Sequence, residues 1–159
     1  MSSKPSDSQP PALQRGLRYL SYRPRSESEV RSYLRRLGCS PDAVETTIAK
    51  LRSLNYLNDE SFARTWAWSR AKNRGYGPRR IEQELWTKGI SQLLAREIVR
   101  ETYAQEDEKT LARQLLAKRF KGQNLQEPKN LHRAVALLQR RGYSAKVVFD
   151  LLKYSVDED

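Results

Sequence analysis

The residues best suited to chemistry are basic side chains gathered around one turn, and their natural ligands are phosphate and carboxylate groups. The turn is Gly75-Tyr76-Gly77-Pro78. Arg79 and Arg80 follow it in the first turn of the next predicted helix, where the helix dipole favours acidic residues instead. A bound anion that faced both side chains and the free N–H groups of this helix end would remove the conflict. We therefore predict anion binding here; the alternative is that Glu82 and Glu84 compensate the two arginines on a solvated face.

Further basic residues extend this candidate surface. Tyr76 lies among arginines, so its ring is a candidate for stacking or partner contact. The run from Lys118 to Lys121 is a second basic cluster. Arg140 and Arg141 precede a glycine and suit the negative end of a helix, which favours a structural role for them. The predicted partner or DNA-binding set is Arg70, Lys72, Arg74, Tyr76, Arg79, Arg80, Lys88, Lys118, Arg119 and Lys121.

Nothing in the sequence indicates catalysis. His132 is the only histidine and has no cysteine or carboxylate at metal-ligand spacing. Cys39 is the only cysteine, which excludes an internal disulfide and a cysteine-based zinc site. Gly75 and Gly77 follow a predicted helix, whereas the glycines of a dinucleotide-binding loop follow a strand. We expect no catalytic residues, no metal and no cofactor, and hence not an enzyme.

Composition points to an acidic or polyanionic partner. The chain has 159 residues, a net charge of +11, 31% charged residues and 38% hydrophobic residues. This modest apolar fraction suits thin helical layers better than one thick core. No apolar run approaches the roughly 20 residues that cross a membrane, and no signal peptide is apparent. We therefore expect a cytoplasmic location and no membrane contact; a protein with merely solvated basic faces is the alternative.

Three copies of one sequence pattern must position these residues. The pattern is an apolar residue, a leucine four positions later, a glycine four positions after that, and then a serine, as in Val30-x3-Leu34-x3-Gly38-x-Ser40. It returns at Ile81–Ser91 and at Ala134–Ser144. In each copy the glycine ends one helix and the serine caps the next. We predict an all-α fold of three tandem three-helix repeats in an elongated, curved array.

The helices and their boundaries follow from apolar periodicity and capping signals. Repeat one covers 12–57, repeat two 58–104 and repeat three 105–154, between a disordered tail at 1–11 and an acidic tail at 155–159. Phe62 and Trp66, four residues apart, are expected in the core. The predicted helices are 12–22, 26–37, 41–54, 59–73, 78–88, 91–103, 106–120, 128–141 and 144–153.

The central stretch resembles the motif of a known family, RecX, the bacterial recombination regulators. The residues that carry the resemblance are Tyr56-Leu57-Asn58-Asp59, Phe62-Ala63, Arg70, Gly75-Tyr76-Gly77-Pro78-Arg79-Arg80-Ile81, Glu84-Leu85 and Lys88-Gly89-Ile90. Weaker similarity extends from Ala12 to Lys153 and includes Arg141-Gly142-Tyr143. RecX proteins consist of tandem three-helix repeats, which agrees with the pattern found independently.

The resemblance implies a non-enzymatic regulator that binds the RecA recombinase and its filament on single-stranded DNA. It implies suppression of recombinase, strand-exchange and co-protease activity in DNA repair and the SOS response. We expect a monomer that contacts RecA, single-stranded DNA and, as a further ligand, double-stranded DNA. Charge reversal at Arg79 and Arg80 is predicted to abolish inhibition while leaving helix content intact. The alternatives are a general basic DNA-binding protein, and an adaptor that docks an acidic protein without binding DNA.

Overall fold

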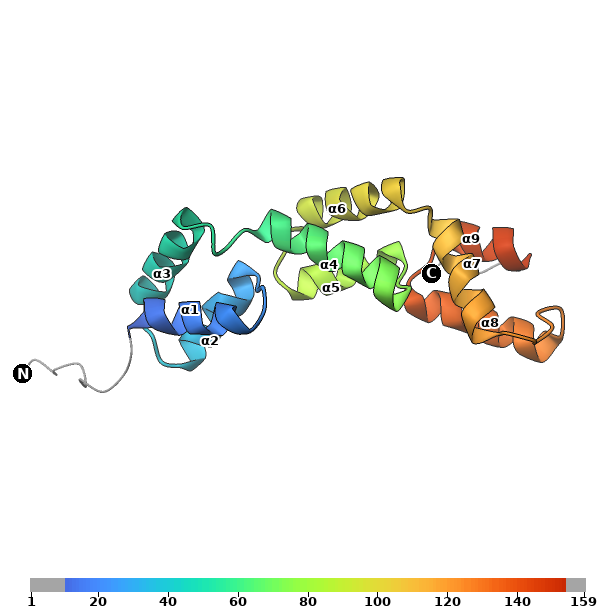
Figure 1. Cartoon of the computed structure of the whole chain (residues 1–159), viewed down its shortest axis with the longest axis horizontal. Coiled ribbons are helices and arrows are strands. Elements are labelled where there is room, and N and C mark those ends of the chain that lie inside the picture. The colour runs from blue at the N-terminus through green and yellow to red at the C-terminus, as the bar shows by residue number, and fades with distance from the viewer. Residues whose placement is uncertain (1–10, 154–159) are drawn as a thin grey trace, which may run out of the picture. The chain divides into compact units, whose positions relative to one another are not determined.

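The computed structural model describes residues 11–153, and over that range all of its regular secondary structure is helical (Figure 1). The all-α fold expected from the sequence is therefore confirmed. The predicted acidic tail, and all of the predicted disordered tail except Pro11, lie outside the described residues. The helices are α1 (Ala12–Tyr22), α2 (Glu27–Arg36), α3 (Pro41–Ser53), α4 (Asp59–Arg74), α5 (Pro78–Thr87), α6 (Gln92–Gln105), α7 (Glu108–Arg119), α8 (Pro128–Arg141) and α9 (Ala145–Leu152).

The capping residues found in the sequence begin the helices as predicted. The Ser40 hydroxyl accepts a hydrogen bond from the Ala43 N–H at 3.2 Å. Ser91 and Ser144 cap α6 and α9 in the same way. The Asn58 side chain accepts from the Ser61 N–H at 3.0 Å and begins α4. Such caps satisfy N–H groups that have no partner inside a helix, so they fix where each helix starts.

The described residues divide into two compact units, the first ending at Phe62 and the second starting at Ala63. In the first unit α1, α2 and α3 pack against one another. Their apolar faces enclose a core whose fully buried members are Val30, Leu34, Val44, Ile48, Leu51 and Leu57. The predicted apolar stripes of α2 and α3 are therefore the buried ones.

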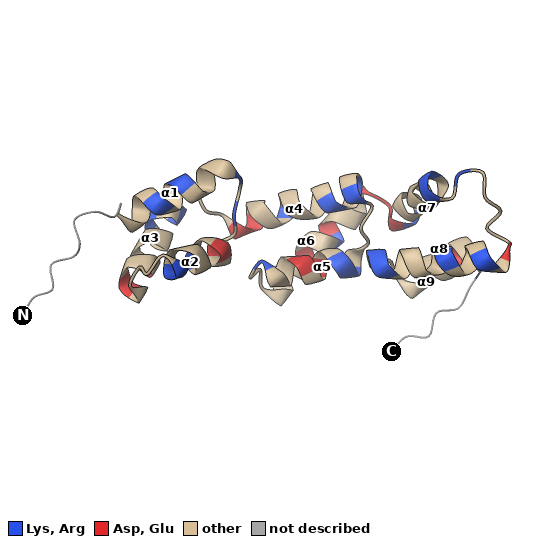
Figure 2. Cartoon of the chain, turned by 90° about the horizontal axis from the view of Figure 1, so that it is seen from below, with Lys and Arg blue, Asp and Glu red and all other residues tan. Residues whose placement is uncertain are grey.

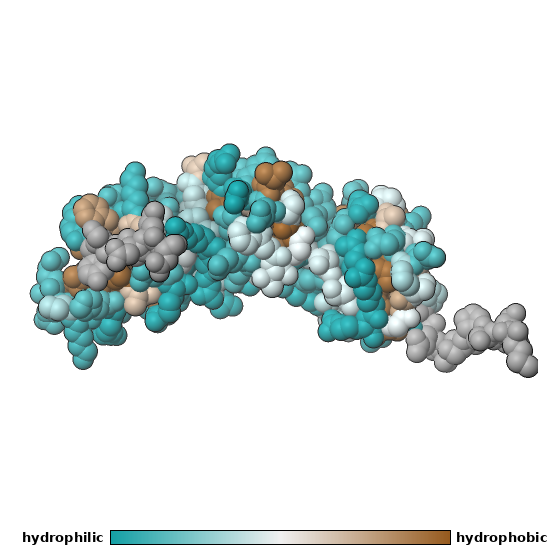
Figure 3. All heavy atoms as spheres, turned by 180° about the vertical axis from the view of Figure 1, so that it is seen from behind, coloured by the Kyte–Doolittle hydropathy of each residue, from teal (hydrophilic) through white to brown (hydrophobic). Residues whose placement is uncertain are grey.

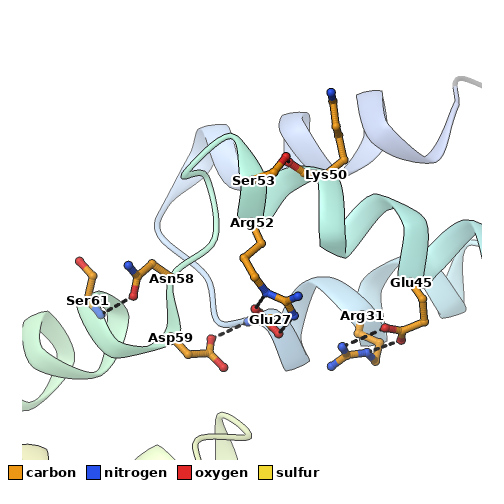
Figure 4. A network of polar contacts seen from close by, with 9 residues as sticks. All are labelled: Glu27, Arg31, Glu45, Lys50, Arg52, Ser53, Asn58, Asp59 and Ser61. Atoms are coloured by element: carbon orange, nitrogen blue, oxygen red, sulfur yellow. Dashed lines mark hydrogen bonds and ion pairs between the residues drawn. The ribbon is translucent and has the colours of Figure 1, made fainter.

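Ion pairs between α2 and α3 brace the first unit from outside (Figure 4). Arg52 holds the Glu27 carboxylate with two hydrogen bonds of 2.7 and 2.9 Å. Arg31 holds Glu45 in the same way, at 2.7 and 3.3 Å. The Asp59 carboxylate accepts from the Glu27 N–H at 2.9 Å and so ties the start of α4 to the start of α2. Arg31 and Arg52 are therefore already paired with carboxylates of the first unit.

The second unit contains α5 to α9 and most of α4. In it α5 packs on α6, α9 packs on α7 and α8, and α5 also reaches α8. The part formed by α7, α8 and α9 has its own core, in which Ala134, Leu138 and Val148 are fully buried. Phe62 is buried, as expected, whereas Trp66 is only half-buried. The division into exactly three repeats and the curved shape of the array stay predictions.

The outer surface of the described residues is mostly polar. On the face shown in Figure 3, hydrophobic residues form small separate patches on a hydrophilic background. Lysine and arginine are spread over many helices in Figure 2. A functional surface must therefore be found from the contacts of individual charged side chains.

Candidate functional site

The start of α5, where anion binding was predicted, meets the end of α8 (Figure 2). The Gly77 N–H donates to the Arg141 carbonyl at 2.6 Å, and the Arg79 N–H donates to the Gly142 carbonyl at 3.0 Å. The prediction that these N–H groups are free for a ligand is therefore wrong. The negative end of the α8 dipole occupies the place that we assigned to a bound anion.

This contact also explains why Arg80 stands at the start of α5. The Arg80 guanidinium donates to the Arg140 carbonyl at 3.3 Å, so it serves the C-terminus of α8 across the junction. It also stacks on the Tyr76 ring, 3.9 Å from the centroid, and donates to the Tyr76 hydroxyl at 3.0 Å. Arg141 lies 5.4 Å from the same ring. The Tyr76 ring and Arg80 are thus engaged within the molecule.

Two glycines allow the backbones to approach so closely. A Cβ atom on Gly77 would lie 2.5 Å from the Gly142 carbonyl carbon, and one on Gly142 would lie 2.3 Å from the Arg80 nitrogen. Gly142 also has a φ of +87°, which L-residues with a side chain seldom adopt. Alanine at either position would force α5 and α8 apart. We call this contact the α5–α8 junction.

Buried polar groups hold the turn before α5. The Tyr143 hydroxyl donates to the Gly75 carbonyl at 3.0 Å, and the Tyr103 hydroxyl donates to the Tyr76 carbonyl. Burial raises the pKa of both phenols, so both remain protonated donors. Arg141 donates to the Arg74 carbonyl at the end of α4. The structural role expected of Arg141 at a helix end is met on α4.

Arg70 and Lys88 belong to a separate cluster around Trp66. Arg70 lies over the indole ring, 4.0 Å from its centroid, and the Lys88 ammonium is 4.8 Å away. Glu84 accepts from the indole N–H at 3.0 Å and from Arg70 at 3.1 Å. Glu84 therefore pairs with Arg70 between α4 and α5, whereas the Lys88 ammonium faces the Trp66 ring.

Five of the predicted residues line a groove of about 610 Å³ in the second unit, namely Lys72, Arg74, Tyr76, Lys118 and Arg119. Arg74, Lys118 and Arg119 line it together with Arg141, and its apolar wall comes from α4 and α7. Lys72 also lines it but pairs with Glu106 at 2.8 Å. We call this feature the basic groove; its full lining is residues 71–76, Leu111, Gln114, Leu115, Lys118, Arg119 and Arg141.

Several arginines of the described residues pair with a carboxylate, whereas the groove cations have no acidic partner among those residues. Arg64 pairs with Glu101 at 3.0 Å and Arg96 pairs with Glu82 at 3.3 Å. Within residues 11–153, by contrast, no carboxylate lies within 4.0 Å of the charged nitrogens of the four groove cations Arg74, Lys118, Arg119 and Arg141. The groove therefore brings together four cations whose charge is not compensated by a carboxylate of the described residues. Arg79 and Lys121 are exposed and do not line the groove.

A smaller hollow continues the basic surface past Arg119. It is lined by Arg119, Phe120, Arg133 and Arg140, among others, and Arg133 lies 5.5 Å from the Phe120 ring centroid. Arg133 is not among the residues predicted from the sequence to bind a partner or DNA. Its spacing from Arg140 could have revealed it, because residues seven apart lie on one face of a helix.

Other classes of site find no counterpart in the described residues. Within 11–153 no three His, Cys, Asp or Glu side chains gather as metal ligands would. Over the same range no helix has both the length and the apolar character needed to cross a bilayer. The basic groove is thus the feature on which a functional argument can be built.

Comparisons with known proteins place the chain in a family. Residues 12–51 match the model of the first three-helix domain of RecX, and residues 58–98 match the model of its second three-helix domain. These segments contain α1 to most of α3 and α4 to half of α6. The matched segments fall within the first two predicted repeats.

Whole relatives support the same assignment. "Regulatory protein RecX" of Corynebacterium efficiens is 34% identical over 151 residues, covering 91% of this chain and 71% of the relative. The protein of the same name from Listeria welshimeri is 32% identical over 136 residues, covering 85% and 50%. That of Bacillus subtilis is 34% identical over 149 residues, covering 91% and 56%. The chain thus spans about half the length of the Listeria and Bacillus relatives.

Solved structures share the fold. The crystal structure of RecX from Lactobacillus salivarius superposes with a TM-score of 0.76 at 24% identity, covering 89% of this chain and 92% of that one. A second crystal structure, of a regulatory protein RecX, gives a TM-score of 0.70 at 27% identity, covering 89% and 70%. Sequence models, whole relatives and fold agree, and the chain belongs to the RecX family.

Proposed function

We propose that this chain is a non-enzymatic regulator that binds the RecA recombinase and its filament on single-stranded DNA and inhibits recombinase activity. Two observations support the proposal. The relatives are named regulatory proteins, and the family resemblance implies RecA as the regulated protein. The observation that carries it is that four cations without an acidic partner in the described residues line one groove, on a chain of net charge +11.

The mechanism that we infer is electrostatic docking on a negatively charged polymer. A RecA–DNA filament presents phosphates and acidic side chains, and complementary charge speeds encounter and fixes orientation. Occupation of the filament by this chain obstructs strand exchange. Any ATP hydrolysis belongs to RecA, because the inferred role of this chain needs only binding. The chain acts as a monomer in the cytoplasm in this proposal.

Reversal of two groove charges tests the proposal. In Lys118→Glu/Arg119→Glu the apparent affinity for RecA filaments is expected to fall about tenfold or more, since like charges replace opposite ones. The measurement is the concentration of this protein that halves RecA strand exchange. These residues replace the Arg79 and Arg80 pair as targets, because Arg80 stabilises the α5–α8 junction and its substitution would disturb the fold.

The chain contains a closely matched control. Arg35 and Arg36 are adjacent, exposed and in the last turn of α2, as Lys118 and Arg119 are in the last turn of α7. Arg35→Glu/Arg36→Glu therefore changes the net charge and the helix-dipole energy equally. Equal loss of inhibition in both variants would mean that total charge matters and the groove does not. Equal inhibition of an unrelated strand-exchange protein would indicate a general DNA-binding protein.

A further inference from the structure

The basic groove combines an apolar floor with a charged rim. Ala71 and Leu111 are buried, and Leu115 is half-buried beside them. Arg74, Lys118, Arg119 and Arg141 surround this floor. A ligand that fills the groove must therefore offer an apolar group flanked by negative charge.

The rim cations are held near one another without an internal counter-charge. Burial and the Arg119 and Arg80 charges lower the pKa of the Arg141 guanidinium. This direction shows that the positive charge is disfavoured by its surroundings, although an arginine stays protonated at neutral pH. An anion bound at the rim would relieve both the repulsion and part of the desolvation cost. Charge complementarity therefore specifies an acidic occupant.

The groove lacks what a nucleic acid strand would need for tight binding. Single strands bind by stacking their bases on aromatic rings along a basic track. Tyr76 is the one aromatic residue of the groove lining, and its ring already stacks on Arg80 and lies beside Arg141. The leucine floor has no complementary group in a sugar–phosphate backbone. A peptide, in contrast, can supply carboxylates and an apolar side chain together.

We propose that the basic groove binds an acidic protein segment in which an apolar side chain lies between carboxylates. The apolar side chain rests on Leu111 and Leu115, and the carboxylates pair with the rim cations. This inference rests on the proposed function, because it makes the recombinase protein, not the DNA phosphates, the component of the filament that the groove contacts.

Fluorescence anisotropy with synthetic probes tests this assignment on the full chain. The probes are a labelled acidic peptide with a central leucine, the same peptide with the leucine replaced by serine, the same peptide with Gln and Asn in place of Glu and Asp, and an oligo-dT strand. The acidic leucine peptide is expected to bind at least about tenfold tighter than either altered peptide. Lys118→Glu/Arg119→Glu is expected to weaken it about tenfold, and Arg35→Glu/Arg36→Glu is expected to leave it within about twofold.

The changes on the peptide side cannot unfold the protein, so their outcome is decisive even if a variant is unstable. The inference is overturned if the serine peptide binds as well as the leucine peptide. It is also overturned if no peptide binds and Lys118→Glu/Arg119→Glu lowers only the affinity for the oligo-dT strand. Failure of the proposed function has a different signature: the unchanged protein would then neither bind RecA in a pull-down without DNA nor slow strand exchange, whatever the peptides do.

Discussion

Substitution of Gly142 by alanine is the most direct perturbation of the α5–α8 junction. The added Cβ would lie 2.3 Å from the Arg80 nitrogen and 2.6 Å from the Arg80 Cβ. Since atoms cannot remain at that distance, α5 and α8 must separate. Separation breaks the hydrogen bonds from Gly77 to Arg141 and from Arg79 to Gly142. The predicted consequence is local loosening of the second unit.

The magnitude follows from two contributions. A side chain in the left-handed conformation costs about 1 kcal/mol or slightly more. Each lost hydrogen bond removes about 1 kcal/mol net. The opening free energy around the junction should therefore fall by about 3 kcal/mol in Gly142→Ala.

Gly38 supplies the control. It holds the same position in the first repeat and has a φ of +81°, but a Cβ there meets nothing within 4 Å. Gly38→Ala should therefore show only the conformational cost of about 1 kcal/mol. The difference of about 2 kcal/mol is the contribution of the junction.

Native-state hydrogen exchange measures both effects with one observable. The opening free energy of amides in α8 and α9 is compared between Gly142→Ala and the unchanged protein, and that of α2 and α3 between Gly38→Ala and the unchanged protein. If Gly142→Ala lowers protection no more than Gly38→Ala does, the close contact of the two backbones contributes nothing and the reasoning fails.

Two other substitutions test individual contacts. Tyr143→Phe removes the hydrogen bond to the Gly75 carbonyl and should lower the unfolding free energy of the second unit by about 1 kcal/mol. The measurement is urea unfolding followed by tryptophan fluorescence. An unchanged free energy would mean that water replaces this hydrogen bond without a net loss of stability. Arg52 lowers the pKa of Glu27, so the stability from this pair is present above the ordinary pKa and is lost as the pH falls through the lowered value. Glu27→Gln should therefore cost about 0.5 kcal/mol near neutral pH and progressively less as the pH falls through the lowered pKa of Glu27. A loss that does not change with pH, measured by unfolding followed by circular dichroism, would contradict the pairing.

Local sequence signals predicted most of the fold. Serine caps at Ser40, Ser91 and Ser144, and the glycine at Gly142, mark helix ends through contacts only a few residues away. Such signals depend on the neighbouring backbone, so they can be recognised in the sequence. The helix boundaries accordingly agree with the structure to within two residues.

The candidate site is formed by contacts between residues that lie far apart in the sequence, and local spacing cannot reveal such contacts. Arg80 and Arg140 are 60 positions apart, so the sequence could not show that the helix end needing an anion faces the end of α8. The sequence correctly showed that an arginine in the first helical turn needs a negative partner. For Arg80 that partner is the C-terminal end of α8, not a bound anion. Lys118 and Arg119 were predicted as a basic extension, but no spacing in the sequence links them and the neighbouring Leu111 and Leu115 to the end of α4. Only tertiary packing of α7 against the end of α4 makes the two leucines a groove floor.

The main-chain character of the α5–α8 junction has a consequence for how such proteins diversify. Peptide groups are the same whatever side chains surround them, and two glycines suffice to let them meet. Lineages can therefore exchange the residues that face a partner without changing the main-chain contact between α5 and α8. The main chain holds the α5–α8 junction, whereas side chains would contact a partner, so the two can change at different rates in evolution.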